Sequence, residues 1–280
     1  MKIGIIGNGF VGKATGILLC NDIEIMVYDI KPELCSPDVK RLEDILVCDF
    51  IFLSLPTPMS NDGSCYLKIV EDMVLKLKNL DYKGFIVLRS TIPVGTSDNL
   101  GIYFMPEFLT EKNYLNDFKN NKEWIFGLPG LDTDDKFKES ISRLFNLAYK
   151  NGKINYNKIS FLQNKEAEMV KLFRNCYLST KLSFCNEIYR FCEKQNIEYE
   201  NVRNIACNDE RIGHSHSNVP GHDGKFGFGG TCFPKDLNSL IHQFEKVSVD
   251  CPVINSVKKR NEEIDRTEKD WAHDKGRAVI

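Results

Sequence analysis

Short apolar runs alternate with helical stretches through the first half of the chain. Six runs rich in β-branched or aromatic residues, bounded by Pro, Gly, Asp or Asn, are predicted as strands: Lys2–Ile6, Ile23–Tyr28, Phe50–Leu55, Phe85–Ser90, Tyr103–Met105 and Trp124–Gly127. Leu67–Leu80 and Asp134–Tyr149 have helical spacing, and a further helix is expected after the first run, ending at Leu19. Strands that are apolar along their length indicate a parallel sheet with helices on both faces. We therefore expect a doubly wound α/β fold that binds ligands at the carboxyl ends of its strands.

The pattern changes near residue 164. From Asn164 onward the chain has no Pro or Gly until Gly213, which predicts a helix of about 30 residues and roughly 45 Å. Bulky residues recur along one stripe of this helix, at Met169, Phe173, Cys176, Thr180, Phe184, Ile188 and Phe191. Residues 211–231 are rich in Gly and His and are predicted as a loop, with helices again from about Pro234 and Pro252. We expect two domains, 1–163 and 164–280, the second of them helical.

Composition and charge exclude several classes of protein. The 280 residues include 37 basic and 39 acidic side chains, so the formal net charge is -2, which gives no general attraction for nucleic acid or an anionic membrane. No apolar run approaches the roughly 20 residues of a membrane helix, and the N-terminus lacks a signal-peptide cleavage site. Ten scattered cysteines without a CxxC pair favour reduced thiols and a cytoplasmic location.

A glycine turn follows the first predicted strand. Gly7 permits a tight turn, Gly9 allows a pyrophosphate to approach the backbone, and Gly12 allows close packing of the following helix. Asp29 ends the second strand about 20 residues further on, where a carboxylate accepts hydrogen bonds from a ribose 2′-hydroxyl. The turn therefore predicts a dinucleotide site that favours NAD over NADP, although the nearby Lys31 leaves NADP open.

A second glycine-rich segment, Gly227–Asp236, contains the most distinctive cysteine of the chain. Cys232 follows three glycines, two positions after the last of them, at the start of a predicted helix, where the helix dipole favours a thiolate. Lys235 adds positive charge one turn later. The other cysteines are expected to be small buried hydrophobic residues, so Cys232 is the candidate nucleophile.

Two further pairs carry candidate chemistry. Lys171 and Asn175 are four positions apart and therefore lie on one face of the long helix, where a cation and an amide can stabilise an oxyanion. Glu107 and Glu111 follow the fifth strand, and one of them is a candidate general base with a pKa raised by burial. Without other signals, the first pair is also compatible with an ordinary helix surface.

These segments together resemble the UDP-glucose/GDP-mannose 6-dehydrogenase family. Seven motifs occur in the family's order over nearly the whole chain: Gly7–Gly12, Leu55–Pro58, Ser90–Thr96, Pro106–Leu109, Lys171–Asn175, Asp209–Gly213 and Gly227–Asp236. The resemblance implies a Rossmann-like sheet, a long central helix and a small all-α domain. It also implies NAD-dependent four-electron oxidation of the C6 alcohol of a nucleotide sugar to a carboxylate. The Pro-Lys-Asp after the cysteine is more similar to the UDP-glucose and GDP-mannose branches, and UDP-glucose is the expected substrate.

The resemblance also implies roles for individual residues. Cys232 matches the nucleophile that traps the aldehyde as a thiohemiacetal and then forms a thioester. Lys171 and Asn175 match the pair that stabilises the oxyanion, and Glu111 matches the base that activates the hydrolytic water. The residues that match those holding water near the site are Thr91 and Asp236.

The implied binding residues fall into two sets. The residues that match NAD contacts are Gly7, Gly9, Phe10, Val11, Gly12, Asp29, Thr57, Thr91, Glu111 and Lys235. Those that match the sugar-nucleotide pocket are Glu107, Phe108, Leu109, Lys171, Asn175, Arg211, Phe226, Phe228 and Gly229. In the family, the arginine matched by Arg211 reaches the substrate of a neighbouring subunit, so a homodimer through the long helix is expected.

The chain departs from the family in two places. Family members carry a further α/β domain that contributes to the nucleotide pocket, and we expect this chain to be a short form without it. The stretch His214–Lys225 is longer than usual, and its three histidines suggest a metal, but without a nearby cysteine pair we predict none.

Two rival functions remain open. A two-electron β-hydroxyacid dehydrogenase would share the nucleotide-binding domain and a lysine–asparagine pair but would not need Cys232. A truncated, non-catalytic paralogue that binds a nucleotide is the other alternative.

Overall fold

The structure, a computed structural model, describes residues 1–36 and 39–280. Its contacts divide the chain into two compact units. The first comprises Met1–Thr57 and Leu67–Lys171, and the second comprises Pro58–Tyr66 and Leu172–Ile280.

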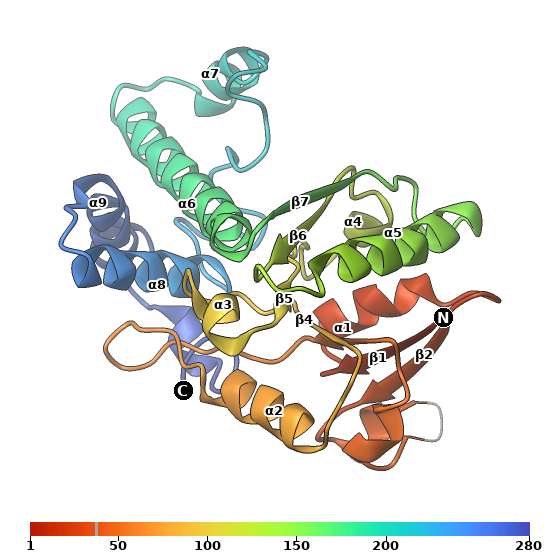
Figure 1. The fold of residues 1–280 in the computed structure, drawn as a ribbon. Helices are drawn as coiled ribbons and strands as arrows, with labels where there is room; N and C mark the ends of the chain where they lie inside the picture. Colours follow the sequence, from red (N-terminus) through yellow and green to blue (C-terminus); the bar gives the residue numbers. More distant parts are fainter. Residues whose placement is uncertain (37–38) are drawn as a thin grey trace. The chain divides into compact units, whose positions relative to one another are not determined.

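The first unit is built on a seven-stranded sheet (Figure 1). Its strands are β1 (Lys2–Ile6), β2 (Glu24–Tyr28), β3 (Phe50–Leu53), β4 (Phe85–Leu88), β5 (Tyr103–Phe104), β6 (Trp124–Leu128) and β7 (Ile159–Gln163). The spatial order is β2-β1-β3-β4-β5-β6-β7, and all neighbours are parallel except β5 and β6. The predicted doubly wound α/β fold is therefore confirmed, with β7 and the antiparallel β5–β6 pair added to it.

Helices cover both faces of this sheet, because alternate side chains of buried strands point to opposite sides. The helices of the first unit are α1 (Phe10–Thr15), α2 (Lys68–Asn79), α3 (Thr96–Leu100), α4 (Tyr114–Lys119) and α5 (Asp134–Lys150). Phe50 and Phe52 belong to the core that includes residues of α1, α4 and α5. Ile51 and Leu53 belong to the core on the other face, which includes residues of α2. The helix expected to end at Leu19 is shorter than predicted, since α1 gives way to a 3₁₀ turn at Gly16.

The second unit is helical, as predicted. Its helices are most of α6 (Asn164–Lys194), followed by α7 (Tyr199–Ala206), α8 (Phe233–Lys246) and α9 (Pro252–Arg260). Helix α6 has 31 residues, which confirms the predicted long helix. Both α8 and α9 carry Pro in the first turn, where its missing N–H costs no hydrogen bond. The predicted loop over residues 211–231 is confirmed, since no helix or strand interrupts the described chain between α7 and α8.

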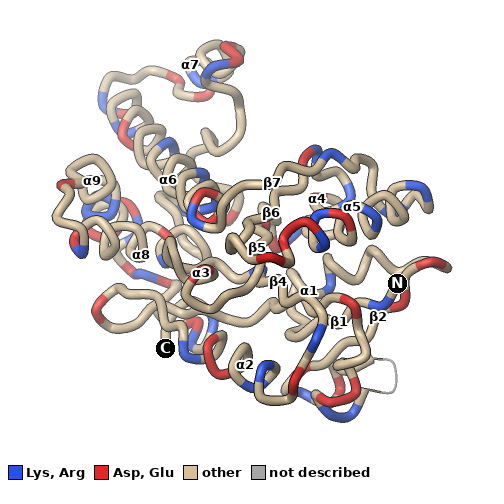
Figure 2. Tube along the Cα trace, in the orientation of Figure 1, with Lys and Arg blue, Asp and Glu red and all other residues tan. Residues whose placement is uncertain are grey.

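The bulky stripe of α6 divides into a buried and an exposed part. Cys176 is buried, whereas Phe173, Phe184 and Phe191 are each more than half exposed, as is Tyr177 one turn after Phe173. Among the described residues, no helix is long and apolar enough to cross a bilayer. Lys and Arg are interspersed with Asp and Glu along the chain (Figure 2), in keeping with the small net charge.

Candidate active site

The three glycines of the first turn have three different environments. Gly7 has φ +90°, and a Cβ there would lie 2.4 Å from the carbonyl oxygen of Ser54. A Cβ on Gly12 would lie 2.0 Å from the carbonyl oxygen of Gly7, so only glycine lets α1 approach the turn this closely. A Cβ on Gly9 would meet nothing within 4 Å. The turn is therefore closed at Gly7 and Gly12 and open at Gly9, which fits the approach of a dinucleotide pyrophosphate.

The carboxylate of Asp29 is fixed at the end of β2 beside this turn. Its Oδ2 accepts a hydrogen bond from the backbone N–H of Asn8 at 2.7 Å, and its Oδ1 accepts one from the N–H of Lys31 at 2.9 Å. The backbone N–H of Gly7 donates to the carbonyl of Tyr28 at 2.9 Å, which ties the turn to the same strand. An oriented carboxylate here suits the hydroxyls of an NAD ribose and opposes a 2′-phosphate.

Two loops at the carboxyl edge of the sheet are joined by hydroxyl groups. The hydroxyl of Thr57 donates to the carbonyl of Thr91 at 2.7 Å. The hydroxyl of Ser90 donates to the carbonyl of Leu55 at 2.6 Å and accepts from the N–H of Leu55 at 3.1 Å. The segments after β3 and β4, both predicted to contact ligands, are therefore held together.

Lys171 and Glu107 form a buried ion pair in the first unit. The ammonium of Lys171 lies 2.5 Å from Oε1 of Glu107 and 2.8 Å from its carbonyl oxygen. The other carboxylate oxygen of Glu107 accepts from the N–H of Leu109 at 2.8 Å. Glu111, the predicted base, is exposed in this unit. Of the two carboxylates predicted after β5, Glu107 is thus the buried one, and it orients Lys171.

Arg89 is a buried cation that is not among the predicted site residues. Its guanidinium is 2% exposed, donates to the carbonyl of Val11 at 3.4 Å and to the hydroxyl of Thr15, and lies 5.3 Å from the ring of Phe118. Burial lowers the pKa of Arg89 to about 10, and the charge of Glu107 opposes this shift. The available signal was a basic residue inside an otherwise apolar strand run.

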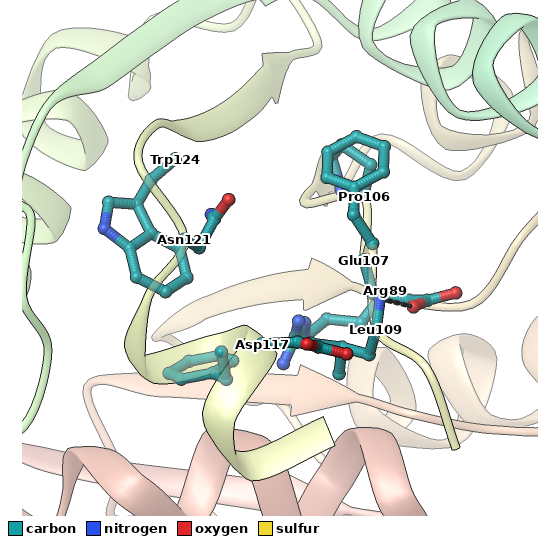
Figure 3. A pocket seen from close by; sticks show the side chains of 9 residues that line it. Arg89, Pro106, Glu107, Leu109, Asp117, Asn121 and Trp124 are labelled. Carbon is teal, nitrogen blue, oxygen red and sulfur yellow. Dashed lines mark hydrogen bonds between the residues drawn. The ribbon is translucent and has the colours of Figure 1, made fainter. Parts of the chain in front are cut away.

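Arg89 also lines a small pocket at the end of the sheet. In Figure 3, Pro106, Glu107 and Leu109 lie on one side of this pocket, and Asn121 and Trp124 lie on the other. The pocket thus lies between α4 with its following turn and the segment after β5. Arg89 connects this region to α1.

In the second unit, Cys232 is the N-cap residue of α8, and a buried polar network lies in the first turn of that helix. Asp236 is fully buried; its Oδ1 accepts from the ammonium of Lys235 at 2.7 Å, and its Oδ2 accepts from the amide of Asn175 at 2.5 Å. Burial alone would lower the pKa of Lys235, but the charges of Asp236, Cys65 and Cys232 outweigh it and raise that pKa. Since Coulomb interactions are mutual, the Lys235 ammonium favours the thiolate of Cys232.

The remaining predicted residues of the second unit lie in the loop before α8. Phe228 is buried, and Phe226 and Gly229 are partly exposed. Arg211 is exposed, and its side chain donates to the carboxylate of Asp209, two positions earlier in the chain. Among the described residues, no group of three His, Cys, Asp or Glu side chains is arranged to hold a metal ion.

The predicted site residues are thus distributed over both units. The first unit holds Gly7, Gly9, Phe10, Val11, Gly12, Asp29, Thr57, Thr91, Glu107, Phe108, Leu109, Glu111 and Lys171, and the second holds Asn175, Arg211, Phe226, Phe228, Gly229, Cys232, Lys235 and Asp236. Within the first unit the structure brings Lys171 to Glu107. Within the second it brings Asn175 and Lys235 to Asp236.

Two models of one protein family match this chain. The model of the UDP-glucose/GDP-mannose dehydrogenase NAD binding domain matches residues 36–147, and the model of the central domain of the same family matches residues 165–263. The chain belongs to the UDP-glucose/GDP-mannose dehydrogenase family. Its first unit accordingly contains the NAD-binding domain of this family, and the glycine turn and Asp29 fit that cofactor.

Sequence similarity to relatives within this family covers nearly the whole chain. UDP-glucose 6-dehydrogenase YwqF of Bacillus subtilis is 28% identical over 93% of this chain and 66% of its own length. UDP-glucose 6-dehydrogenase of Rickettsia typhi is 27% identical over 93% of this chain and 67% of its own length. The structure of a UDP-glucose dehydrogenase from Pyrobaculum islandicum has the same fold, with a TM-score of 0.77 at 24% identity, over 93% of this chain and 68% of the other. The chain therefore spans about two thirds of the length of these relatives.

Proposed function

We propose that this chain catalyses the NAD-dependent four-electron oxidation of the C6 alcohol of a nucleotide sugar, converting UDP-glucose to UDP-glucuronate through a covalent intermediate on Cys232. The observation that carries the proposal is the placement of Cys232 at the N-terminus of α8, next to the buried network of Lys235, Asp236 and Asn175. A two-electron dehydrogenase has no need for a thiolate in this position.

The N-terminus of α8 provides the nucleophile. The helix dipole and the ammonium of Lys235 both favour the thiolate of Cys232. NAD, when bound, supplies the acceptor for two electrons in each of two oxidation steps. The thiolate adds to the aldehyde carbon to give a thiohemiacetal, and loss of a second hydride from this carbon gives a thioester. Because the aldehyde stays bonded to sulfur, it is not released as a product.

Lys171 and Asn175 are proposed to stabilise the oxyanions of these steps. Each donor is oriented by a buried carboxylate, Lys171 by Glu107 and Asn175 by Asp236, so neither has to reorganise when charge develops. They are one turn apart on α6 and therefore point in a similar direction from that helix.

Hydrolysis of the thioester is assigned to Glu111. Its exposure allows the carboxylate to accept a proton from an attacking water molecule, after which the thiolate of Cys232 leaves. The balanced reaction consumes one alcohol, two NAD⁺ and one water, and it yields one carboxylate, two NADH and three protons. Both oxidation steps remove a hydride from the same carbon atom, C6 of the sugar.

The experiment that tests the function is turnover of the purified chain with NAD and a panel of UDP-glucose, GDP-mannose and UDP-N-acetylhexosamines. We expect two NADH per sugar acid, with UDP-glucose preferred. One NADH per carbonyl product would identify a two-electron dehydrogenase. No NADH with any nucleotide sugar would favour a protein that binds nucleotides without turnover.

Cys251 offers a matched control for the role of Cys232. It is also an N-cap residue followed by Pro in the first turn of its helix, α9. Cys232→Ala should abolish formation of the acid, whereas Cys251→Ala should retain it. Equal activity of both variants would contradict the proposal.

We also propose a cytoplasmic homodimer formed through α6. The described cysteines are thiols, which suits a reducing compartment. The exposed aromatic side chains of α6, Phe173, Tyr177, Phe184 and Phe191, form an apolar stripe of the kind that partner subunits bury. Light scattering should give the mass of a dimer, and Phe184→Asp combined with Phe191→Asp should give a monomer. A wild-type monomer at micromolar concentration would contradict this assignment.

A further inference from the structure

The backbone just before Cys232 is held in place by buried polar side chains from distant parts of the second unit. Asn261 uses both ends of its carboxamide on one residue: its Oδ1 accepts from the N–H of Phe228 at 2.8 Å, and its Nδ2 donates to the carbonyl of Phe228 at 2.9 Å. The preceding N–H, of Gly227, donates to Oδ1 of Asn186 on α6 at 3.0 Å. Asn261 and Asn186 are both almost completely buried.

Arg266 holds the same segment from its other end. Its guanidinium donates to the carbonyl of Phe226 at 3.2 Å and to the carboxylates of Asp223 and Asp270. The polar groups of three successive residues, Phe226 to Phe228, are thus bound by side chains of Arg266, Asn186 and Asn261. Buried amide contacts of this kind are costly to leave unsatisfied, so they define the path of the backbone strongly.

Two glycines make room where these side chains meet the loop. Gly227 has φ +66°, and a Cβ there would lie 2.3 Å from Oδ1 of Asn261. A Cβ on Gly229 would lie 2.6 Å from Oδ1 of Asp270. The glycines of the motif therefore make room for Asn261 and for the Arg266–Asp270 pair, which gives them a role separate from ligand binding.

The position of Asn261 in the chain explains how it reaches the loop. It is the first residue of a π-helical turn, Asn261–Asp265, that directly follows α9. The N–H of Arg266 donates to the carbonyl of Asn261 at 2.8 Å across this wider turn. Such turns insert one extra residue and redirect the side chains around them. Here Asn261 and Arg266 both face the loop.

We propose that Asn261 is a positioning residue for Cys232, an inference that rests on the proposed function of that thiol. Only three residues separate Phe228 from Cys232, and two of them are glycines. The ring of Phe228 also meets the ring of Phe233, the residue after Cys232, edge to face with 6.1 Å between centroids. Fixing the Phe228 peptide therefore fixes both the approach to the N-cap and the first residue of α8. Loss of the Asn261 contacts frees the glycines to move the thiol.

The test compares Asn261→Ala with Asn255→Ala. Asn255 belongs to the same helical region, on α9, but is exposed. The rate of alkylation of Cys232 by iodoacetamide is followed from pH 6 to 9 by peptide mass spectrometry, which separates this thiol from the other nine. We expect Asn261→Ala to change the rate about tenfold and to displace its pH profile, because small misplacements of a reactive group have large effects. Asn255→Ala should match the wild type.

Turnover supplies the second measurement. In Asn261→Ala, kcat/KM for the nucleotide sugar should fall about tenfold or more, while KM for NAD stays near the wild-type value because the NAD-binding turn belongs to the other unit. If Asn261 had a purely structural role, its replacement would lower the melting temperature without a selective fall in kcat/KM for the nucleotide sugar. An unchanged alkylation profile together with unchanged kcat/KM would overturn the proposal.

Asn261→Asp keeps the test decisive if the alanine variant does not fold. An ionised aspartate can accept from the N–H of Phe228 but repels its carbonyl, whereas a protonated one can both donate and accept. The change in the alkylation rate of Cys232 relative to wild type should therefore shrink as the pH falls. A change in this rate that is independent of pH would contradict the proposal. Alkylation needs no turnover. Failure of the wild type to oxidise any nucleotide sugar would overturn the proposed function and leave the alkylation result to decide the positioning role.

Discussion

The side-chain amide of Asn175 on α6 lies 2.5 Å from Oδ2 of Asp236 on α8, which joins two predicted site residues that are 61 positions apart in the sequence. The other oxygen of the same carboxylate accepts from Lys235. Asp236 therefore orients one proposed oxyanion donor and also compensates the buried charge next to Cys232.

Replacing Asp236 by Asn should destabilise the protein at neutral pH. One of the hydrogen bonds to the side chain at position 236 is lost. In addition, the ammonium of Lys235 remains buried without a counter-charge, which costs roughly 3–5 kcal/mol. Since the folded-state pKa of Lys235 is raised, the stability from its charge is fully present below the unfolded lysine pKa of about 10.4. Urea unfolding at pH 7 should thus show this deficit in the variant. The exposed Asp250→Asn is the control, and an equal effect of both changes would contradict the assignment.

Alanine substitutions in the first glycine turn should separate binding from folding. Gly9→Ala places a methyl group in open space and should leave the melting temperature unchanged while weakening NAD binding. Gly12→Ala forces a methyl group against the carbonyl of Gly7, and overpacking of this kind costs about 1–3 kcal/mol. Calorimetric titration with NAD and thermal melts measure the two effects. The account is wrong on this point if Gly9→Ala binds NAD as the wild type does.

Glu168 should make stability depend on pH in the acidic range. Burial raises its pKa, and the hydrogen bonds from the N–H groups of Ser97 and Gly95 offset this only in part. A carboxyl with a raised folded-state pKa stabilises the protein below its unfolded pKa of about 4.3, and this contribution is lost as the pH rises through the folded value.

Glu168→Gln removes this titration. The free energy of unfolding of the wild type should therefore fall relative to that of the variant as the pH rises above about 4.3, and the difference should become constant near neutral pH. Urea titrations from pH 4 to 8 measure this difference, with the exposed Glu71→Gln as control. A difference that does not vary over this range would refute the assignment.

Arg89→Met should separate stability from cofactor binding. Burial of the guanidinium carries a desolvation cost, so an apolar side chain of similar length should keep the free energy of unfolding within about 1.5 kcal/mol of wild type. The hydroxyl of Thr15 still donates to the carbonyl of Val11 at 3.1 Å when the guanidinium is removed. The positive charge next to the first turn of α1 is lost, however, and the Kd for NAD should rise about fivefold or more. An unchanged Kd for NAD would show that Arg89 contributes only to the stability of the fold.

The sequence patterns that correspond to fully buried elements were the most informative. Phe50–Leu53 and Phe85–Leu88 are strands buried on both faces, and their continuous apolar runs allowed their prediction. Strand β7, Ile159–Gln163, is only half-buried at the edge of the sheet, so its pattern is weaker and it was missed. The two-residue strand β5 carries no signal for the direction of its neighbour, and the antiparallel β5–β6 pair was likewise unforeseen.

Candidate site residues were predictable when their chemistry was local. Cys232 and Lys235 are three positions apart in a glycine-rich motif, whereas the pairing of Lys171 with Glu107 depends on contacts 64 positions apart. Asn261 was missed because it lies in a charged run, Lys258 to Asp265, that is typical of a solvated helix face. The structure instead buries Asn261, because the π turn directs its side chain toward the backbone of Phe228.

Mass spectrometry of the enzyme quenched during turnover tests the role of Cys232 most directly. Glu111→Gln, which should slow hydrolysis, is mixed with NAD and UDP-glucose, stopped in acid and digested. We predict a peptide containing Cys232 that carries the mass of a thioester-linked sugar nucleotide, formed together with two NADH per modified chain. Turnover to UDP-glucuronate without any adduct on this peptide, together with wild-type acid formation by Cys232→Ala, would contradict it.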